Sequence, residues 1–266
     1  MTKLENLIDW FKDTSGVLIA LSGGVDSALV AYAAYQKLGP SALAVTADYK
    51  TLAQDELQTA KKVCSEIGIS QILLNYDELE NKEFVKNDSK RCFYCRQELG
   101  TRLKKLANQR KIELIVDGTN LDDLGEYRPG IEALKQNGIR SPLVENNFTK
   151  NEIRDTAKSV GLSVYDKPSN SCLASRIPWG QKITSERLMR IEYSENVIKQ
   201  TTKLSQVRVR DLQGIAKLEV EKEKIPVLKD IAIFEEISKK LKLIGFSEII
   251  IDPEGYQSGK INVIAD

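Results

Sequence analysis

The 266-residue chain contains no histidine, and this absence excludes several kinds of catalytic chemistry. Without imidazole there is no Ser-His or Cys-His nucleophile pair, no His-ligated zinc or haem, and no histidine general base. The groups left to bind a metal ion are the four cysteines, the carboxylates and the backbone oxygens. A nucleophile in this protein must therefore arrive already ionised, as a thiolate or a sulfide.

The chain also carries almost no net charge and has no long apolar runs. Lys and Arg number 39 and Asp and Glu 38, so the formal net charge of +1 gives no general reason to expect nucleic acid as a partner. Apolar runs such as 28–34 are far shorter than the roughly 20 residues of a membrane span. Acidic residues precede any apolar stretch at the start of the given sequence, so a signal peptide is not expected there. We expect a cytoplasmic protein without a membrane partner, whose thiols stay reduced.

Apolar runs typical of buried strands alternate with helical patterns in the first part of the chain. Helical spacing is predicted for 3–13, 26–38 and 52–66, and strands for 16–21, 42–47, 72–74 and 113–116. This alternation predicts an α/β fold with a parallel sheet, in a nucleotide-binding domain that spans 1–168. Cys64 lies on the apolar face of its helix and is expected to be a core residue.

The pattern changes after about residue 168 and predicts a smaller α+β domain over 169–266. Helices are expected at 184–203, capped by Thr184, and at 229–243. The segments 206–210 and 215–220 alternate with period two, as half-exposed antiparallel strands do, and 248–251 is a last strand. From residue 183 onward, basic and acidic residues are equal in number, which is not typical of a nucleic-acid module.

The segment Ser22-Gly-Gly-Val-Asp-Ser27 lies between a predicted buried strand and a predicted helix. Its glycines, Gly23 and Gly24, let the backbone approach an anion, and the helix adds free N–H groups and the positive end of its dipole. Ser22 and Ser27 supply hydroxyl donors, and Asp26 can hold Mg²⁺. A plain Gly-Gly turn is the alternative, but the whole hexapeptide in this context favours phosphate binding.

The hexapeptide resembles the PP-loop signature of ATP pyrophosphatases, a group that includes GMP synthetase, NAD synthetase and tRNA-thiolating enzymes. It is not a Walker A loop, because no Gly-Lys-Ser/Thr follows. The resemblance implies that ATP is cleaved between its α and β phosphates. An oxygen of the acceptor is adenylated and pyrophosphate leaves, so that a weak nucleophile can then displace AMP.

Three of the four cysteines suggest a metal site. Cys92-Phe-Tyr-Cys95 opens a predicted helix that reaches about residue 109, and Cys172 lies in a polar segment near the expected domain junction. Three thiolates suit a [4Fe–4S] cluster with one open iron, although the pair alone also fits a redox couple or chance. Together with the PP-loop, the pattern favours a cluster held by Cys92, Cys95 and Cys172.

A set of motifs along nearly the whole chain resembles the LarE family. The motifs are Ser22 to Ser27, Asp117-Gly-Thr-Asn120, Glu126-Tyr-Arg-Pro-Gly130, Arg140-Ser-Pro-Leu143, Cys172-Leu-Ala-Ser-Arg-Ile-Pro-Trp-Gly180 and Val207-Arg-Val-Arg210, of which the segment around Cys172 is the most specific. The resemblance implies an ATP-dependent sulfur transferase that builds the nickel-pincer nucleotide of lactate racemase. Its substrate would be a pyridinium dicarboxylate mononucleotide, whose carboxylates become thiocarboxylates.

The family has two versions, and both remain open for this chain. In one, a single cysteine at the position of Cys172 gives up its sulfur and becomes dehydroalanine. In the other, that cysteine joins a Cys-x-x-Cys pair to hold a [4Fe–4S] cluster whose open iron carries sulfide. The presence of Cys92 and Cys95 resembles the cluster version, which requires a further sulfur donor.

Polar residues in and near these motifs receive predicted roles as well. Arg208 and Arg210 leave the same face of a predicted strand, and with Arg176 they are expected to bind the phosphate of the mononucleotide; a solvated strand face is the alternative. The resemblance to LarE implies that Glu195 and Glu219 lie near the sulfur site, although ordinary surface charge explains them almost as well. Asp117, Gly118 and Thr119 are assigned to the nucleotide, with a turn as the alternative.

Gln257 departs from the family pattern, which often has Arg there, so a charge contact from this position is in doubt. The competing functions are tRNA thiolation, which the balanced charge disfavours, and a non-catalytic adenine-nucleotide sensor with a redox thiol pair. We expect a homo-oligomer that takes a small-molecule substrate.

Overall fold

The computed structural model describes residues 2–125 and 128–257, and its contacts divide the chain into two compact units. The first unit comprises Met1–Glu78 and Cys92–Asn170. The second comprises Leu79–Arg91 and Ser171–Asp266, so a short segment between two elements of the first unit belongs to the second. Among the described residues, no helix is both long enough and apolar enough to cross a membrane.

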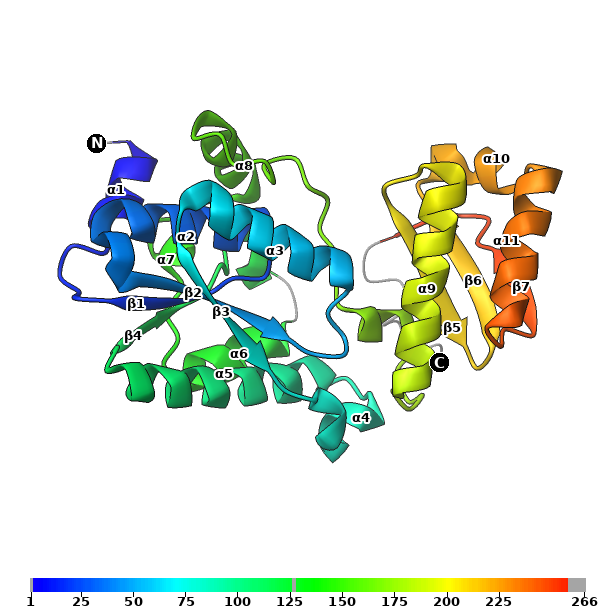
Figure 1. Cartoon of the computed structure of the whole chain (residues 1–266), viewed down its shortest axis with the longest axis horizontal. Coiled ribbons are helices and arrows are strands. Elements are labelled where there is room, and N and C mark those ends of the chain that lie inside the picture. The colour runs from blue at the N-terminus through cyan, green and yellow to red at the C-terminus, as the bar shows by residue number, and fades with distance from the viewer. Residues whose placement is uncertain (1, 126–127, 258–266) are drawn as a thin grey trace. The chain divides into compact units, whose positions relative to one another are not determined.

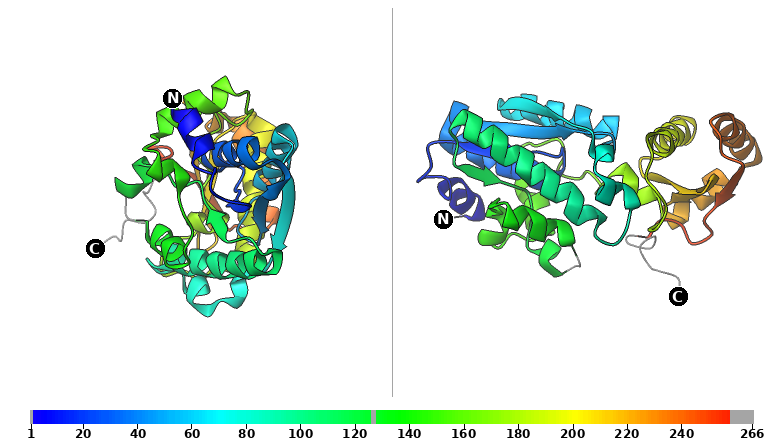
Figure 2. Two further views of the ribbon diagram at one scale, coloured as in Figure 1. Left: turned by 90° about the vertical axis from the view of Figure 1, so that its left-hand side faces the viewer. Right: turned by 90° about the horizontal axis from the view of Figure 1, so that it is seen from below.

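The first unit is built on a four-stranded parallel sheet with the strand order β3-β2-β1-β4 (Figures 1 and 2). The strands are β1 (Val17–Ala20), β2 (Ala42–Asp48), β3 (Ser70–Asn75) and β4 (Leu114–Val116). Each pairing in this sheet is parallel, which confirms the predicted fold class. The apolar runs at 16–21, 42–47, 72–74 and 113–116 therefore coincide with strands of this sheet, as the sequence predicted.

Helices cover both faces of this sheet. They are α1 (Lys3–Asp9), α2 (Val25–Leu38), α3 (Gln54–Ile67), α5 (Arg91–Arg110), α6 (Pro129–Gln136), α7 (Pro142–Glu145) and α8 (Lys150–Ser159), with short 3-10 turns η1 (Gly39–Ser41) and η3 (Asp122–Gly125). Capping boxes start α1, from Thr2 to Glu5, and α8, from Thr149 to Glu152. The first helix begins where the pattern predicted but ends at Asp9 instead of continuing to residue 13.

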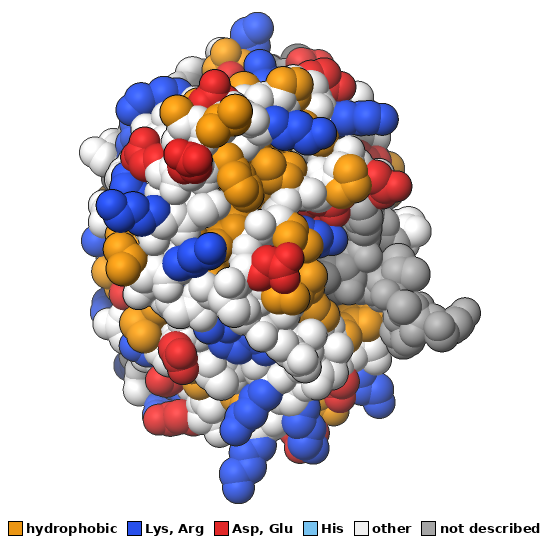
Figure 3. Space-filling view, turned by 90° about the vertical axis from the view of Figure 1, so that its right-hand side faces the viewer, with side chains coloured by type: hydrophobic (Ala, Val, Ile, Leu, Met, Phe, Trp, Pro, Cys, Tyr) orange, Lys and Arg blue, Asp and Glu red, His pale blue; other side chains and the backbone are white. Residues whose placement is uncertain are grey.

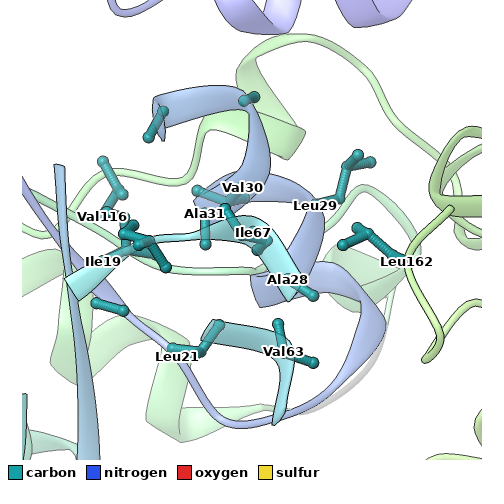
Figure 4. Packing of buried hydrophobic residues seen from close by; sticks show 14 of the residues in the cluster. Ile19, Leu21, Ala28, Leu29, Val30, Ala31, Val63, Ile67, Val116 and Leu162 are labelled. Carbon is teal, nitrogen blue, oxygen red and sulfur yellow. The ribbon is translucent and has the colours of Figure 1, made fainter. Parts of the chain in front are cut away.

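Alternate residues of the central strands face two separate cores. Val17 and Ile19 of β1 point to a core shared with α2, α3 and α8, part of which Figure 4 shows. Leu18, between them, faces a second core formed with α5 and α6. Since every second side chain of a strand points to the same face, a continuous apolar strand can serve two helical layers.

The second unit contains a three-stranded sheet with the strand order β5-β6-β7. Its elements are η2 (Glu78–Glu80), α4 (Lys82–Lys86), η4 (Leu173–Arg176), α9 (Ser185–Thr202), β5 (Val207–Leu212), β6 (Ile215–Val220), η5 (Lys222–Lys224), α10 (Ile225–Leu228), α11 (Ile231–Leu243) and β7 (Glu248–Ile251). The strands β5 and β6 are antiparallel, and β7 is parallel to β6. The predicted Thr184 cap of α9 is confirmed, because its hydroxyl accepts a hydrogen bond from the Arg187 N–H.

One face of this sheet packs against helices, but the other face is also buried at β5. Val207 and Val209 join a core with α9, α10 and α11. Arg208 and Arg210 point to the opposite face, yet each is only 4% exposed. The prediction that β5 is half-exposed is therefore wrong, because η4 lies near this strand and the two arginines are enclosed with carboxylates.

Candidate functional site

The segment from Ser22 to Ser27 forms a tight turn between β1 and α2. The Ser27 hydroxyl donates to the Gly24 carbonyl at 3.1 Å and accepts from the Ser22 N–H at 3.2 Å. Gly24 is the N-cap residue of α2 and has no side chain to satisfy the first N–H groups of that helix. Those donors and the helix dipole therefore remain available to an anion, as the sequence predicted for a phosphate loop.

Two glycines permit the close packing around this turn. Gly23 has a φ of +81°, and a Cβ there would lie 2.9 Å from the Glu56 carbonyl oxygen of α3. Gly118 follows β4, and a Cβ at this position would lie 2.6 Å from the Ser27 backbone nitrogen. The Asp117-Gly-Thr-Asn120 segment thus lies directly against the first turn of α2, which is possible only without a side chain at Gly118.

Asp26 points toward a lysine that the sequence did not single out. Its carboxylate forms an ion pair of 2.5 Å with the Lys150 ammonium group and accepts a hydrogen bond of 3.3 Å from the Asn120 amide. Lys150 is the first residue of α8, and that helix packs against α2. The carboxylate of Asp26, which is predicted to hold Mg²⁺, is therefore paired with the Lys150 ammonium group.

A second lysine reaches the phosphate loop from a distant part of the sequence. The Lys167 ammonium group forms an ion pair of 2.8 Å with Glu56 and lies 3.4 Å from the Gly23 carbonyl oxygen. The Asn170 amide donates to the other oxygen of Glu56 at 2.8 Å. With Lys150, this lysine gives the loop positive neighbours on α8 and beyond it, which suits a polyanionic ligand.

Asp117 is a buried carboxylate with an organising role in its own loop. It accepts hydrogen bonds from the Thr119 N–H at 3.1 Å, the Thr119 hydroxyl at 2.7 Å and the Ser141 hydroxyl at 2.7 Å. Burial raises the pKa of Asp117 above its usual range, and the bonds from Thr119 and Ser141 oppose that rise. The turn interpretation of this segment and a nucleotide-binding role are compatible, since both need the loop fixed.

The cysteine pair lies at the first turn of α5. Cys92 is exposed and Cys95 is half-buried. Arg96, the next residue, interacts electrostatically with both thiols and with Tyr49 and Tyr76. Cys64 differs, because it is 4% exposed and burial raises its pKa to about 12, which confirms it as a core residue.

Cys172 precedes the short turn η4 in the second unit and is half-buried. Arg176, at the end of this turn, is fully buried and forms a two-pronged ion pair with Glu195 of α9, with contacts of 2.8 and 3.1 Å. Its remaining nitrogen donates to the carbonyl oxygens of Ser171 at 2.6 Å and Cys172 at 3.1 Å. The arginine therefore fixes the backbone on which the cysteine is carried.

The second predicted carboxylate, Glu219 of β6, is also paired. It accepts from Arg210 at 2.8 Å, and Arg210 in turn donates to the Ser175 carbonyl at 2.8 Å. Both glutamates are thus structural partners of arginines beneath the Cys172 turn, whereas a direct catalytic role for either stays a prediction. The sequence placed Arg176, Arg208 and Arg210 together, and the structure confines all three within one buried cluster of the second unit.

Arg208 lies close enough to Arg176 and Arg210 for the charges of both to act on it. Its contacts include the Val207 carbonyl at 2.9 Å and the Tyr256 ring, whose centroid is 5.4 Å away. Burial, and after it the charge of Arg176, lower the pKa of Arg208. An anion bound near Arg208 would stabilise its charged form, so phosphate binding by this residue stays a prediction. The hydrogen bonds of Arg176 described above all go to groups of the protein itself.

Parts of two sequence motifs lie outside the residues that the structure describes. Glu126 and Tyr127 of the Glu126-Tyr-Arg-Pro-Gly130 motif, and Ser258 and Gly259 beyond Gln257, are not among the described residues. Within residues 2–125 and 128–257, no group of three or more cysteine and carboxylate side chains is arranged to hold a metal ion. Cys92 and Cys95 belong to the first unit and Cys172 to the second.

A glycine-containing loop between a parallel strand and the N-terminus of a helix, with an aspartate in its first turn, defines a PP-loop ATP pyrophosphatase. Residues 13–98, which include this loop, match the asparagine synthase family. The match ends within α5, so it covers the phosphate loop, the first three strands of the sheet and the cysteine pair.

Relatives of similar length narrow the assignment. An uncharacterized protein of Synechocystis sp. is 41% identical over 98% of this chain and 97% of its own length. Pyridinium-3,5-bisthiocarboxylic acid mononucleotide synthase of Lactiplantibacillus plantarum is 28% identical over 98% of this chain and 94% of its own length. The chain belongs to the LarE family and is an ATP-dependent sulfurtransferase.

A more distant relative is the tRNA-specific 2-thiouridylase of Wolbachia pipientis, at 26% identity. The similarity covers 58% of this chain and 51% of that enzyme, so it extends over only part of both proteins.

We predict that Gly118→Ala weakens ATP binding. The added methyl group would displace the start of α2, where the phosphate-binding N–H groups lie. The expected loss is about tenfold in the Kd of a non-hydrolysable ATP analogue with Mg²⁺, or about 1.4 kcal/mol, measured by calorimetry. Gly125→Ala is the matched control, since a Cβ there meets nothing within 4 Å. Equal Kd values for the two variants would contradict this account of the loop.

We also predict that Glu195→Ala strongly destabilises the second unit. The change leaves the fully buried Arg176 guanidinium without its carboxylate. Removing one partner of a buried ion pair typically costs about 3–5 kcal/mol of the free energy of unfolding, which urea denaturation measures. The exposed Glu186 of the same helix provides the control, and its change to alanine should stay within about 0.5 kcal/mol.

Proposed function

We propose that this protein converts a carboxylate of a pyridinium dicarboxylate mononucleotide into a thiocarboxylate in an ATP-dependent reaction. The observation that carries the proposal is the length of the similarity to the Lactiplantibacillus plantarum synthase, which covers 98% of this chain. That length includes the phosphate loop of the first unit and the Cys172 turn of the second. A relationship restricted to the ATP-binding part would not support the substrate.

In the first step, a carboxylate oxygen of the substrate attacks the α-phosphorus of ATP bound at the loop Ser22 to Ser27. The bond from this phosphorus to the bridging oxygen breaks, and pyrophosphate leaves with the electron pair. Asp26 lies where it would hold Mg²⁺ beside the phosphates, in competition with its present partner Lys150. A lysine released in this way would lie near the departing pyrophosphate, whose negative charge it can stabilise.

In the second step, a sulfide nucleophile attacks the carbonyl carbon of the acyl adenylate. The carbon–oxygen bond to AMP breaks, AMP leaves, and the thiocarboxylate remains. No general base is needed if the sulfur arrives as an anion, which agrees with a chain that contains no histidine. The sulfur must come from an external donor at the oxidation level of sulfide if the protein acts more than once.

The cysteines fit the cluster version of this chemistry. Cys92, Cys95 and Cys172 are exposed or half-buried, and Cys64 is excluded by its burial. We propose that these three residues hold a [4Fe–4S] cluster. When bound, such a cluster supplies an iron without a protein ligand, which can carry sulfide.

The sacrificial version is the second candidate for the sulfur source. Here Cys172 itself loses its sulfur and becomes dehydroalanine, and no iron is involved. The rigid hold of Arg176 on the backbone around Cys172 serves this route equally well, because it presents the side chain from a fixed turn.

Transfer of sulfur to tRNA is a third candidate, favoured by the partial similarity to the 2-thiouridylase of Wolbachia pipientis. Its substrate would require a surface that binds phosphate backbones. The face of the second unit in Figure 3 instead carries Lys and Arg side chains interspersed with Asp and Glu. A tRNA mobility shift that weakens with salt would support this candidate over the mononucleotide.

Replacement of Cys172 tests the proposed reaction. Cys172→Ala should abolish formation of the thiocarboxylate, measured by mass spectrometry of the mononucleotide, while the protein still releases pyrophosphate from ATP. Asp26→Asn should reduce both reactions by about a hundredfold or more, because the ATP site itself is damaged. Continued thiolation by Cys172→Ala would show that this cysteine does not transfer sulfur.

Quantification of iron distinguishes the two sulfur sources. After anaerobic purification, about four irons per chain with matching acid-labile sulfide would support the cluster. Iron-free protein in which Cys172 has become dehydroalanine after turnover would support the sacrificial version instead. The Cys64→Ser variant is the control for adventitious binding, and its iron content should equal that of the unchanged protein.

A further inference from the structure

The side chain of Asn87 joins α4 to the loop that follows Cys172. It is fully buried, and its amide group donates to the carbonyl oxygens of Ile177 at 3.2 Å, Pro178 at 2.8 Å and Gln181 at 2.9 Å. Its φ of 58° lies in the left-handed region, which asparagine tolerates better than most residues. We call residues 171–183 the Cys172 loop.

Backbone hydrogen bonds connect the same two segments. The Gly180 N–H donates to the Asn87 carbonyl at 2.9 Å, and the Ile183 N–H donates to the Val85 carbonyl at 3.1 Å. The segment 79–91 is thus attached to the Cys172 loop by main chain and side chain together. This attachment explains why 79–91 belongs to the second unit, although the elements on either side of it are in the first.

Arg91 extends the attachment toward the cysteines. This residue is 3% exposed, and its guanidinium donates to the Asn87 side-chain oxygen at 2.9 Å and to the Ala174 carbonyl at 3.0 Å. Ala174 lies two residues after Cys172. Arg91 is also the first residue of α5 and is bonded directly to Cys92. A short path of covalent and hydrogen bonds therefore leads from Cys92 to the backbone beside Cys172.

We propose that Asn87 and Arg91 are positioning residues that hold the backbone of the Cys172 loop, and with it Cys172, in one arrangement within the second unit. The proposal rests on the cluster form of the proposed function, in which three thiolates from distant parts of the chain must meet one metal group. Groups behind the ligands fix such geometry, and buried hydrogen bonds from Asn87 and Arg91 to loop carbonyl oxygens favour one arrangement of that backbone. The two residues contact backbone oxygens of the loop and are not themselves ligands.

Asn87→Asp tests this role with minimal change in shape. It replaces the donating amide by an oxygen that faces three carbonyl oxygens, so the loop should detach from 79–91. Hydrogen exchange of the Gly180 and Ile183 amides, measured on protein without iron, should accelerate about tenfold or more, the factor expected for the loss of about 1.4 kcal/mol. Iron per chain after anaerobic reconstitution, with the visible spectrum of the cluster, should fall at least about threefold.

Further variants separate positioning from general destabilisation. Asn81→Ala removes the N-cap of the same short helix, where Asn81 accepts from the Glu83 and Phe84 N–H groups, and should leave iron content close to that of the unchanged protein. Arg91→Lys keeps a cationic N–H donor for the Ala174 carbonyl and should load more iron than Arg91→Met. Binding of an ATP analogue should be equal in all variants, since the phosphate loop is in the first unit.

The outcomes are distinguishable. If the unchanged protein binds iron and Asn87→Asp binds as much, the positioning role is wrong and the proposed function stands. The same conclusion follows if the loop amides exchange at the unchanged rate, or if Asn81→Ala loses as much iron as Asn87→Asp. If the unchanged protein binds no iron at all, the cluster form of the proposed function fails and this proposal fails with it.

Discussion

Two buried ion pairs, Arg176 with Glu195 and Arg210 with Glu219, hold the turn that carries Cys172. A guanidinium inside a protein is stable only when a carboxylate compensates its charge and its remaining N–H groups find acceptors. Here the acceptors are the carbonyl oxygens of Ser171, Cys172 and Ser175. The requirement to satisfy buried charge therefore fixes the main chain around the cysteine, whereas its thiol stays half-buried.

A second constraint, the close approach of backbone to backbone, shapes the ATP site of the first unit. The turn after β1 and the loop after β4 meet at the start of α2, and Gly23 and Gly118 leave the space that this contact requires. The polar groups around it are fixed by one another: Asp117 by Thr119 and Ser141, and Asp26 by Lys150 and Asn120. Such mutual fixing keeps donors and charges in place before a polyanion binds.

The groups proposed for the two chemical steps are distributed over both units. Those proposed for activation of a carboxylate, the phosphate-binding backbone, Lys150 and Asp26, belong to the first unit. Those proposed for sulfur transfer belong to both, because Cys172 and the buried arginines lie in the second unit and Cys92 and Cys95 in the first. The absence of histidine suits both tasks, because neither needs a proton acceptor once the sulfur arrives as an anion.

The sequence alone determined the elements whose signals are local. The apolar strands, the hexapeptide of the phosphate loop, the Thr184 cap and the burial of Cys64 each follow from a few adjacent or regularly spaced residues. The grouping of Arg176, Arg208 and Arg210 was also anticipated, because the family motifs connect them. Elements and faces of this kind can be predicted because spacing along one strand or helix translates directly into a shared face.

Only the tertiary structure decided which side chains pair across long stretches of chain. Lys150 lies 124 positions from Asp26, and Lys167 lies 111 positions from Glu56, so no local pattern connects them. The alternation in β5 predicted an exposed polar face, but the Cys172 turn lies near it and the arginines became buried. The contacts of Asn87 and Arg91 with the Cys172 loop could not be predicted from the sequence either. They are hydrogen bonds to backbone carbonyl oxygens, which every residue type has, so only the path of the folded chain decides which carbonyl groups are reached.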